Sequence, residues 1–296
     1  MIKLLELLVN GVSIGAVYAL IALGFVIIYR ATEVVNFAHA SLVLVGGYIT
    51  AVTHQHIGFW PALGLGIAGA AVLGAALEFL LIRRSKAENR HILAIATIGI
   101  DIVIIAQLTR MIGADVLAMG DPWQNQVVRI GEVSIAQTRI AAFVIAALVL
   151  TGFVLAFKYT SWGLSMRAAA EDDETASLMG VRLGRVSMSA WAVAGGLAAL
   201  AALFLTVFPT PGLDRATSLA AIKAFPAAII GGLDSTNGAL AGGLIVGLTE
   251  SLVTGYQGDL TFLGRGLGEV APFIVMVAIL LIRPTGLFGV KETARV

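Results

Sequence analysis

The sequence predicts an all-α fold, a polytopic transmembrane helical bundle of about eight to nine spans in which some helices are short or broken. Composition supports this, because 58% of the residues are hydrophobic and only 12% are charged, whereas soluble globular domains carry about 25% charged residues. The apolar residues also fall into consecutive stretches close to the roughly twenty residues that a helix needs to cross a bilayer. No polar block is large enough for a second domain, so residues 1–296 are expected to form a single membrane domain.

Eight stretches are clear candidates for membrane spans, and they follow one another along the chain: 7–29, 34–53, 61–82, 92–110, 139–157, 186–208, 238–256 and 267–282. A ninth stretch, 216–231, is short and contains Lys223 and Pro226. If it crosses, most basic residues outside the spans lie on one side of the membrane. The positive-inside rule then places the C-terminus and the interval 161–186 in the cytoplasm.

Several classes of function are excluded by residues that the sequence lacks. The chain has no cysteine, which excludes disulfides, thiolate metal sites and cysteine nucleophiles. The four histidines have no spacing that suggests a metal site, and a net charge of +1 argues against nucleic-acid binding. No GxxxxGK[ST] motif is present, so no P-loop for ATP is expected, and no catalytic triad is apparent. The residues alone therefore indicate a transporter or channel subunit that is not an enzyme.

Small residues recur at four-residue spacing within two of the spans, Gly11 with Gly15 and Gly243 with Gly247. In lipid, such faces let helix backbones approach closely. Packing between helices of one protomer is the favoured interpretation. A protomer interface and backbone exposed along a pathway are the alternatives.

Two stretches look interrupted. In 34–50, a polar group of Asn36, His39 and Ser41 precedes a Gly-Gly pair, and in 223–244 a proline, two Gly-Gly pairs and a polar run occur together. Unwound backbone survives at membrane depth only where protein or a water-filled cavity satisfies its hydrogen bonds, and such segments often border transporter binding sites.

Charged residues within spans are expensive in hydrocarbon and are therefore candidates for a pathway or a buried pair. Glu78 and Glu269 lie near arginines at span ends, which favours pairing at the interface. Asp101, near the centre of its span, and Glu250, on the glycine face of its helix, are the stronger pathway candidates. The predicted translocation pathway residues are Asn36, His39, Ser41, Asp101, Lys223 and Glu250.

One interval stands out from the apolar background, because charged residues crowd into 161–186: Arg167, Glu171, Asp172, Asp173, Glu174, Arg182 and Arg185. It contains alanines and no proline, so we expect a short helix on the cytoplasmic face. Its acidic residues lie nearer the N-terminal end and its later basic residues nearer the C-terminal end, where each charge interacts favourably with the helix dipole. A solvated connector and a docking element for a soluble partner are both compatible with this pattern.

The same interval, "MRAAAEDDETASLMGVRLGRV", resembles the cytoplasmic coupling loop of bacterial branched-chain amino acid ABC transporter permeases of the LivH type. Three more stretches agree in order: "GAVYALIALGFVIIYRATEVVNFAHASLVLVGGY" (15–48), "KAFPAAIIGGLDSTNGALAGGLIVGLTES" (223–251) and "LIRPTGLFG" (281–289). The sequence departs from the family at Ala40, where glycine is frequent, and segment 110–138 matches nothing distinctive.

The resemblance implies a single transmembrane permease domain with a coupling loop at about 158–186, in the bacterial cell (inner) membrane as a multi-pass protein. It implies partners: two cytoplasmic ATPase subunits, a second permease subunit in a hetero- or homodimer, and an extracytoplasmic solute-binding protein. ATP and Mg would be bound by the ATPase subunits, and this chain would hold no cofactor. Coupling to the ATPases would fall on Arg167, Glu171, Asp172 and Gly180.

The resemblance favours branched-chain amino acids as substrates, while urea and short amides fit the same importer architecture. An ATP-independent channel or proton-coupled carrier, with Asp101, Glu250 and His39 as relay groups, is the alternative of another class.

Overall fold

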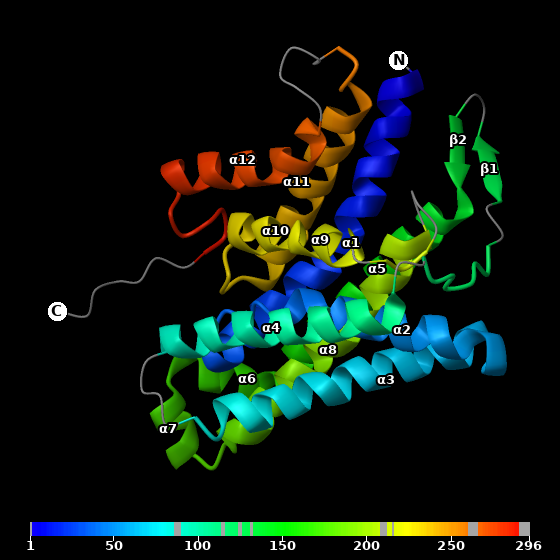
Figure 1. Cartoon of the computed structure of the whole chain (residues 1–296). Coiled ribbons are helices and arrows are strands. Elements are labelled where there is room, and N and C mark those ends of the chain that lie inside the picture. The colour runs from blue at the N-terminus through cyan, green and yellow to red at the C-terminus, as the bar shows by residue number, and fades with distance from the viewer. Residues whose placement is uncertain are drawn as a thin grey trace. The chain divides into compact units, whose positions relative to one another are not determined.

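The structure is a computed structural model of the whole chain and is almost entirely helical (Figure 1). It describes residues 2–85, 90–113, 116–123, 126–130, 133–207, 212–214, 216–259 and 266–289. The chain divides into two compact units. Unit 1 comprises Met1–Val26, Trp123–Ala146 and Ile222–Val296, and unit 2 comprises Ile27–Pro122 and Ala147–Ala221. The single domain expected from the sequence stays a prediction.

Six described helices are long and apolar enough to cross a membrane. They are α1 (Ile2–Thr32), α3 (Phe59–Leu77) continued by the π-helical turn η1 (Glu78–Ile82), α4 (Arg90–Ile112), α5 (Gln137–Tyr159), α8 (Leu183–Val207) and α11 (Thr236–Gly255). The remaining elements are α2 (His39–Ile57), α6 (Ser161–Glu171), α7 (Asp173–Leu178), α9 (Ala216–Ile222), α10 (Ala224–Gly231), α12 (Leu267–Ile282) and the strands β1 (Val127–Ile130) and β2 (Val133–Ala136). The all-α membrane fold is confirmed.

Two of the eight clear spans form helices that are not among the six. Stretch 34–53 is helical only from His39, and the histidines of α2 lower its hydropathy, so this helix is not among the six. Stretch 267–282 forms α12 with the predicted bounds, but its 16 residues make it shorter than any of the six.

The ambiguous stretch 216–231 forms two helices, α9 and α10, that are interrupted at Lys223. Pro226 explains the break, because a proline has no N–H to donate to the carbonyl of residue 222 and its ring clashes with that carbonyl.

Segment 110–138 contains the strands, which the sequence reasoning did not predict; its residues 114–115, 124–125 and 131–132 lie outside the described residues. Strands β1 and β2 pair antiparallel from Val127 opposite Ala136 to Ile130 opposite Val133. In unit 2, Leu117 bridges Leu213 through backbone hydrogen bonds.

In unit 1, α1 and α11 run antiparallel with their backbones in close contact (Figure 1). A Cβ on Gly15 would lie 2.9 Å from the carbonyl oxygen of Gly243, and one on Gly247 would overlap the backbone of Gly15. The four glycines Gly11, Gly15, Gly243 and Gly247 therefore form a helix contact inside one protomer, as the favoured interpretation held.

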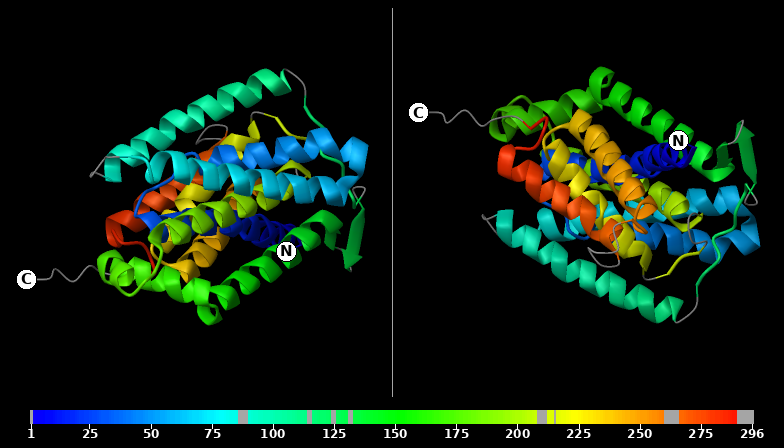
Figure 2. Two further views of the ribbon diagram at one scale, coloured as in Figure 1. Left: turned by 90° about the horizontal axis from the view of Figure 1, so that it is seen from below. Right: turned by 90° about the horizontal axis from the view of Figure 1, so that it is seen from above.

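In unit 2, α2, α3 and α8 pack side by side (Figure 2). A Cβ on Gly46 would overlap Ala199 of α8, and one on Gly195 would overlap the backbone of α3 at Ala70. The Gly46–Gly47 pair lies inside the continuous helix α2, and Gly242–Gly243 lies inside α11. These two pairs therefore do not interrupt their helices, whereas Gly231–Gly232 in the second stretch lies where α10 ends. The two pairs inside helices are packing positions, because a Cβ on Gly46, Gly242 or Gly243 would collide with a neighbouring helix and one on Gly47 would meet the Leu213 side chain.

The stretch 281–289, which resembles the family, forms a turn that caps the C-terminal end of α10. The N–H groups of Leu287 and Phe288 donate to the carbonyls of Ile230 and Gly231, at 2.8 and 3.0 Å. The last carbonyls of a helix have no partner within the helix, so this turn satisfies them. Gly286 permits the turn with φ of 81°.

Candidate functional site

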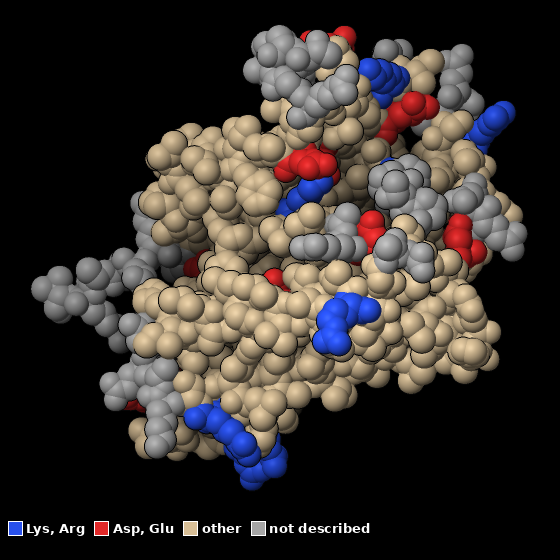
Figure 3. Space-filling view, viewed as in Figure 1, with Lys and Arg blue, Asp and Glu red and all other residues tan. Residues whose placement is uncertain are grey.

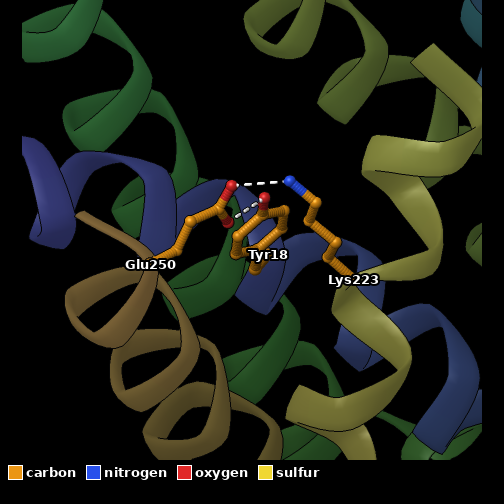
Figure 4. Close-up of polar contacts among 3 residues, drawn as sticks. All are labelled: Tyr18, Lys223 and Glu250. Carbon is orange, nitrogen blue, oxygen red and sulfur yellow. Dashed lines mark hydrogen bonds and ion pairs between the residues drawn. The ribbon is translucent and has the colours of Figure 1, made fainter. Parts of the chain in front are cut away.

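An ion pair lies among the apolar helices of unit 1. Lys223 Nζ lies 2.7 Å from Glu250 Oε1, and the Tyr18 hydroxyl donates to Glu250 Oε2 at 2.6 Å. The three side chains come from the α9–α10 break, from α11 and from α1, and they point toward one another (Figure 4). We call these residues the Tyr18–Lys223–Glu250 cluster.

Local sequence explains how the cluster forms. The break that Pro226 imposes leaves Lys223 between two short helices, from which its side chain reaches α11. The glycine contact brings the α1 and α11 backbones together. Side chains on a helix lean toward its N-terminus, so Tyr18 and Glu250 converge from antiparallel helices.

The cluster compensates its own charge in an environment with few other charges. Figure 3 shows wide uncharged areas with few Lys, Arg, Asp and Glu side chains on the visible face. An isolated charge within a span is costly, and opposite charges in contact offset much of that cost. Tyr18 is 3% exposed, while the side chains of Lys223 and Glu250 keep 17% and 16% of their surface accessible. The ion pair is therefore not fully enclosed by the protein.

The charged groups of Lys223 and Glu250 can form more hydrogen bonds than they form within the cluster. Both carboxylate oxygens of Glu250 accept one bond, and each has a second lone pair. An ammonium group has three N–H donors, and within the described residues the Lys223 ammonium has a single acceptor. The cluster can thus bind a further acceptor at Lys223 and a further donor at Glu250.

A second polar cluster lies in unit 2, where the chain between α1 and α2 is not helical. Asn36 Oδ1 accepts the N–H of Ala38 at 3.0 Å, and Thr97 Oγ1 of α4 accepts the N–H of Phe37 at 3.0 Å. Thr97 is fully buried. Side chains thus accept hydrogen bonds from backbone N–H groups in the non-helical segment between α1 and α2. Unwound backbone at membrane depth requires such partners. The interruption predicted for 34–50 is real, but it precedes the helix.

Asp101 joins this second cluster from α4. Its carboxylate lies within hydrogen-bonding reach of Ser41 of α2, and the Ser41 hydroxyl donates to the carbonyl of Ala38 at 2.8 Å. Asn36, His39 and Ser41 are buried at 1%, 0% and 0% exposure. Four of the six predicted pathway residues therefore belong to the α2–α4 region of unit 2, and the other two form the ion pair of unit 1.

The four residues predicted to couple the permease to ATPases lie in unit 2, within or beside the short helices α6 and α7. Asp172 caps α7, because its carboxylate accepts the Thr175 N–H at 2.9 Å and the Thr175 hydroxyl at 2.9 Å. Arg167 donates to the carbonyls of Phe157 and Lys158 and lies over the Phe157 ring. Glu171 is exposed at the end of α6. Gly180 allows the turn after α7 with φ of 89°. The expected helix on this loop is present as two short helices.

Two members of these clusters were absent from the sequence prediction, Tyr18 and Thr97. A tyrosine and a threonine in an apolar span give no signal by composition, since both commonly pack inside helical bundles. A clue was available for each: Tyr18 stands one turn from Gly15 on the glycine face, and Thr97 stands one turn before Asp101.

Comparison with known proteins gives one family. The family model described as "Branched-chain amino acid transport system / permease component" matches residues 7–281. The high-affinity branched-chain amino acid transport system permease protein LivH of Escherichia coli is 29% identical over 306 residues, covering 99% of this chain and 97% of that protein. The corresponding permease BraD of Pseudomonas aeruginosa is 31% identical over 315 residues, covering 99% and 98%. A probable branched-chain amino acid transport permease LivH of Methanocaldococcus jannaschii is 32% identical over 288 residues, covering 92% and 88%.

Proposed function

Since this chain belongs to the family of branched-chain amino acid transport system permease components, we propose that it is one membrane subunit of an ATP-driven importer for leucine, isoleucine and valine. The chain is an ABC transporter permease and a multi-pass protein of the bacterial inner membrane. Its family consists of transport subunits, and we assign ATP hydrolysis to partner chains.

The proposed assembly contains two cytoplasmic ATPase subunits, which hold ATP and Mg, and a second permease subunit, identical or different. An extracytoplasmic solute-binding protein delivers the amino acid. The names of the relatives support a multi-part system, since they describe permease proteins of a transport system. The absence of a P-loop motif in the sequence is consistent with ATP binding elsewhere.

The observation that carries the proposal is the shape and exposure of the α6–α7 connection. Leu178 and Met179, at the end of α7, are 87% and 81% exposed. Asp173 and Glu174 precede them, Arg182 follows them, and Asp172 fixes the start of the helix. Two exposed apolar residues on a capped helix form a suitable anchor for a pocket on a soluble partner, while the surrounding charges select that partner.

Contacts within unit 2 connect this anchor to two of the long helices. Arg167 ties α6 to the end of α5 through the carbonyls of Phe157 and Lys158. Trp162 Nε1 donates to the Ser189 hydroxyl of α8 at 2.7 Å. We propose that closure of the ATPase dimer moves α6 and α7 and that these contacts transmit the motion to α5 and α8, as rigid-body rocking requires.

The test replaces Leu178 and Met179 with serine in the complete transporter reconstituted in liposomes. We expect leucine uptake and its coupled ATP hydrolysis to fall about tenfold, because apolar anchors of this kind are worth a few kcal/mol at an interface. The matched control exchanges the two residues as Leu178→Met and Met179→Leu, which keeps both apolar and should keep uptake. Full coupling in the serine variant would contradict the docking role. Uptake of urea or acetamide in place of leucine by the unaltered complex would contradict the substrate assignment.

A further inference from the structure

We infer that the Tyr18–Lys223–Glu250 cluster is a binding site for the charged head group of the transported α-amino acid. Lys223 takes the substrate carboxylate and Glu250 takes the substrate ammonium. This inference rests on the proposed function and deepens it, because it names the chemical group that the permease recognises.

The first argument is complementarity of charge. An α-amino acid near neutral pH carries one ammonium and one carboxylate, as the Lys223–Glu250 pair does. When the two lie side by side in opposite directions, each charge meets its opposite, and the total charge within the span stays zero. A neutral solute such as urea gains no such pairing, so the cluster favours amino acids over amides.

The second argument is the unused hydrogen-bonding capacity. The Lys223 ammonium has two N–H groups beyond the one that contacts Glu250 among the described residues, and a carboxylate can accept both. The second lone pairs of Glu250 can accept from a substrate ammonium. The pair therefore does not have to separate when the substrate binds.

The third argument is position and access. Lys223 stands at the junction of the short helices α9 and α10, and discontinuous helices line binding sites in transporters. The side chains of Lys223 and Glu250 keep about one sixth of their surface accessible, at 17% and 16%. Tyr18 is 3% exposed and holds Glu250 by its second oxygen, so it acts as a positioning residue.

The decisive variants alter both charges together, since removal of one partner leaves an uncompensated charge that destabilises a protein whether or not it binds substrate. The neutral variant carries Lys223→Met and Glu250→Gln. The reversed variant carries Lys223→Glu and Glu250→Lys, which keeps an ion pair but turns its direction. The control variant carries Lys3→Met and Glu269→Gln, the same substitutions at other sites of unit 1.

Each variant is assembled with its partner subunits and binding protein in liposomes, and uptake of radiolabelled leucine is measured together with ATP hydrolysis. We expect the neutral and reversed variants to retain ATP hydrolysis while leucine uptake per ATP falls about tenfold or more, because charge-assisted hydrogen bonds to the head group are lost or misdirected. The control variant should match the unaltered transporter.

Leucine uptake by the neutral variant within about twofold of the unaltered transporter would overturn the inference. If the neutral variant does not assemble, the reversed variant decides, because recovery of both assembly and leucine uptake would show that the pair is only structural. Failure of the proposed function has a different signature, since the unaltered transporter itself would then take up no leucine.

Discussion

Lys223 and Glu250 occupy an apolar part of unit 1, where each charge depends on the other for compensation. Sequence reasoning identified both residues because charges within spans are rare and costly. It did not pair them, since they are 27 positions apart and meet only through the packing of α10 and α11. Tyr18 depends on tertiary structure in the same way, because only the fold brings its hydroxyl to the Glu250 carboxylate.

The Thr97 hydroxyl forms hydrogen bonds with backbone groups of two different segments. It accepts the N–H of Phe37 and donates to the carbonyl of Ala94 at 2.6 Å. Replacement by valine keeps the volume but removes the hydrogen bonds to Phe37 and Ala94, and a buried hydrogen bond contributes about 0.5–1.5 kcal/mol.

We therefore expect Thr97→Val to lower the thermal stability of the purified permease, measured by its melting temperature in detergent. Thr97→Ser keeps the hydroxyl and should retain more of the stability. Equal melting temperatures for the valine variant and the unaltered protein would show that Phe37 finds another partner.

Helix positions followed from the sequence with good accuracy, because long apolar stretches determine them almost alone. Helix α12 spans the predicted 267–282, and α5 contains the predicted 139–157. Glycine pairs were harder to interpret. The sequence does not reveal whether a glycine in a span interrupts its helix or allows a neighbouring helix to pack closely. Only the packing showed that Gly46–Gly47 lie inside α2, while the non-helical segment precedes His39.

The contact between α1 and α11 gives a prediction for these elements. A Cβ on Gly247 would overlap backbone atoms of Gly15 and Gly11, which cannot move aside as a flexible side chain can. Gly247→Ala should therefore separate the helices and lower stability by about 1–3 kcal/mol, the usual penalty of overpacking.

Gly99 in α4 provides the control, because a Cβ there meets nothing within 4 Å. Gly99→Ala should be neutral or should raise stability by up to about 1 kcal/mol through helix propensity. Melting temperatures of the two variants measure the difference. A Gly247→Ala variant as stable as Gly99→Ala would mean that α1 and α11 are not held at this close distance.

For the whole molecule, the family assignment and the structure converge on a membrane subunit with a charged, helical connection between α5 and α8. The resemblance in 161–186 and 281–289 has a physical counterpart in each case. The first stretch forms the capped helices α6 and α7, and the second closes the end of α10 with backbone hydrogen bonds. The assembly with partner subunits is our proposal, and the exposed anchor at the end of α7 supports it.

The most direct measurement compares leucine uptake in liposomes that contain the permease with its ATPase subunits, second permease and binding protein, in the presence and absence of ATP. The importer account predicts uptake that requires ATP, the ATPase subunits and the binding protein. Leucine flux through the permease alone, without ATP and with a dependence on pH that disappears when Asp101, Glu250 or His39 is neutralised, would contradict it and identify a proton-coupled carrier.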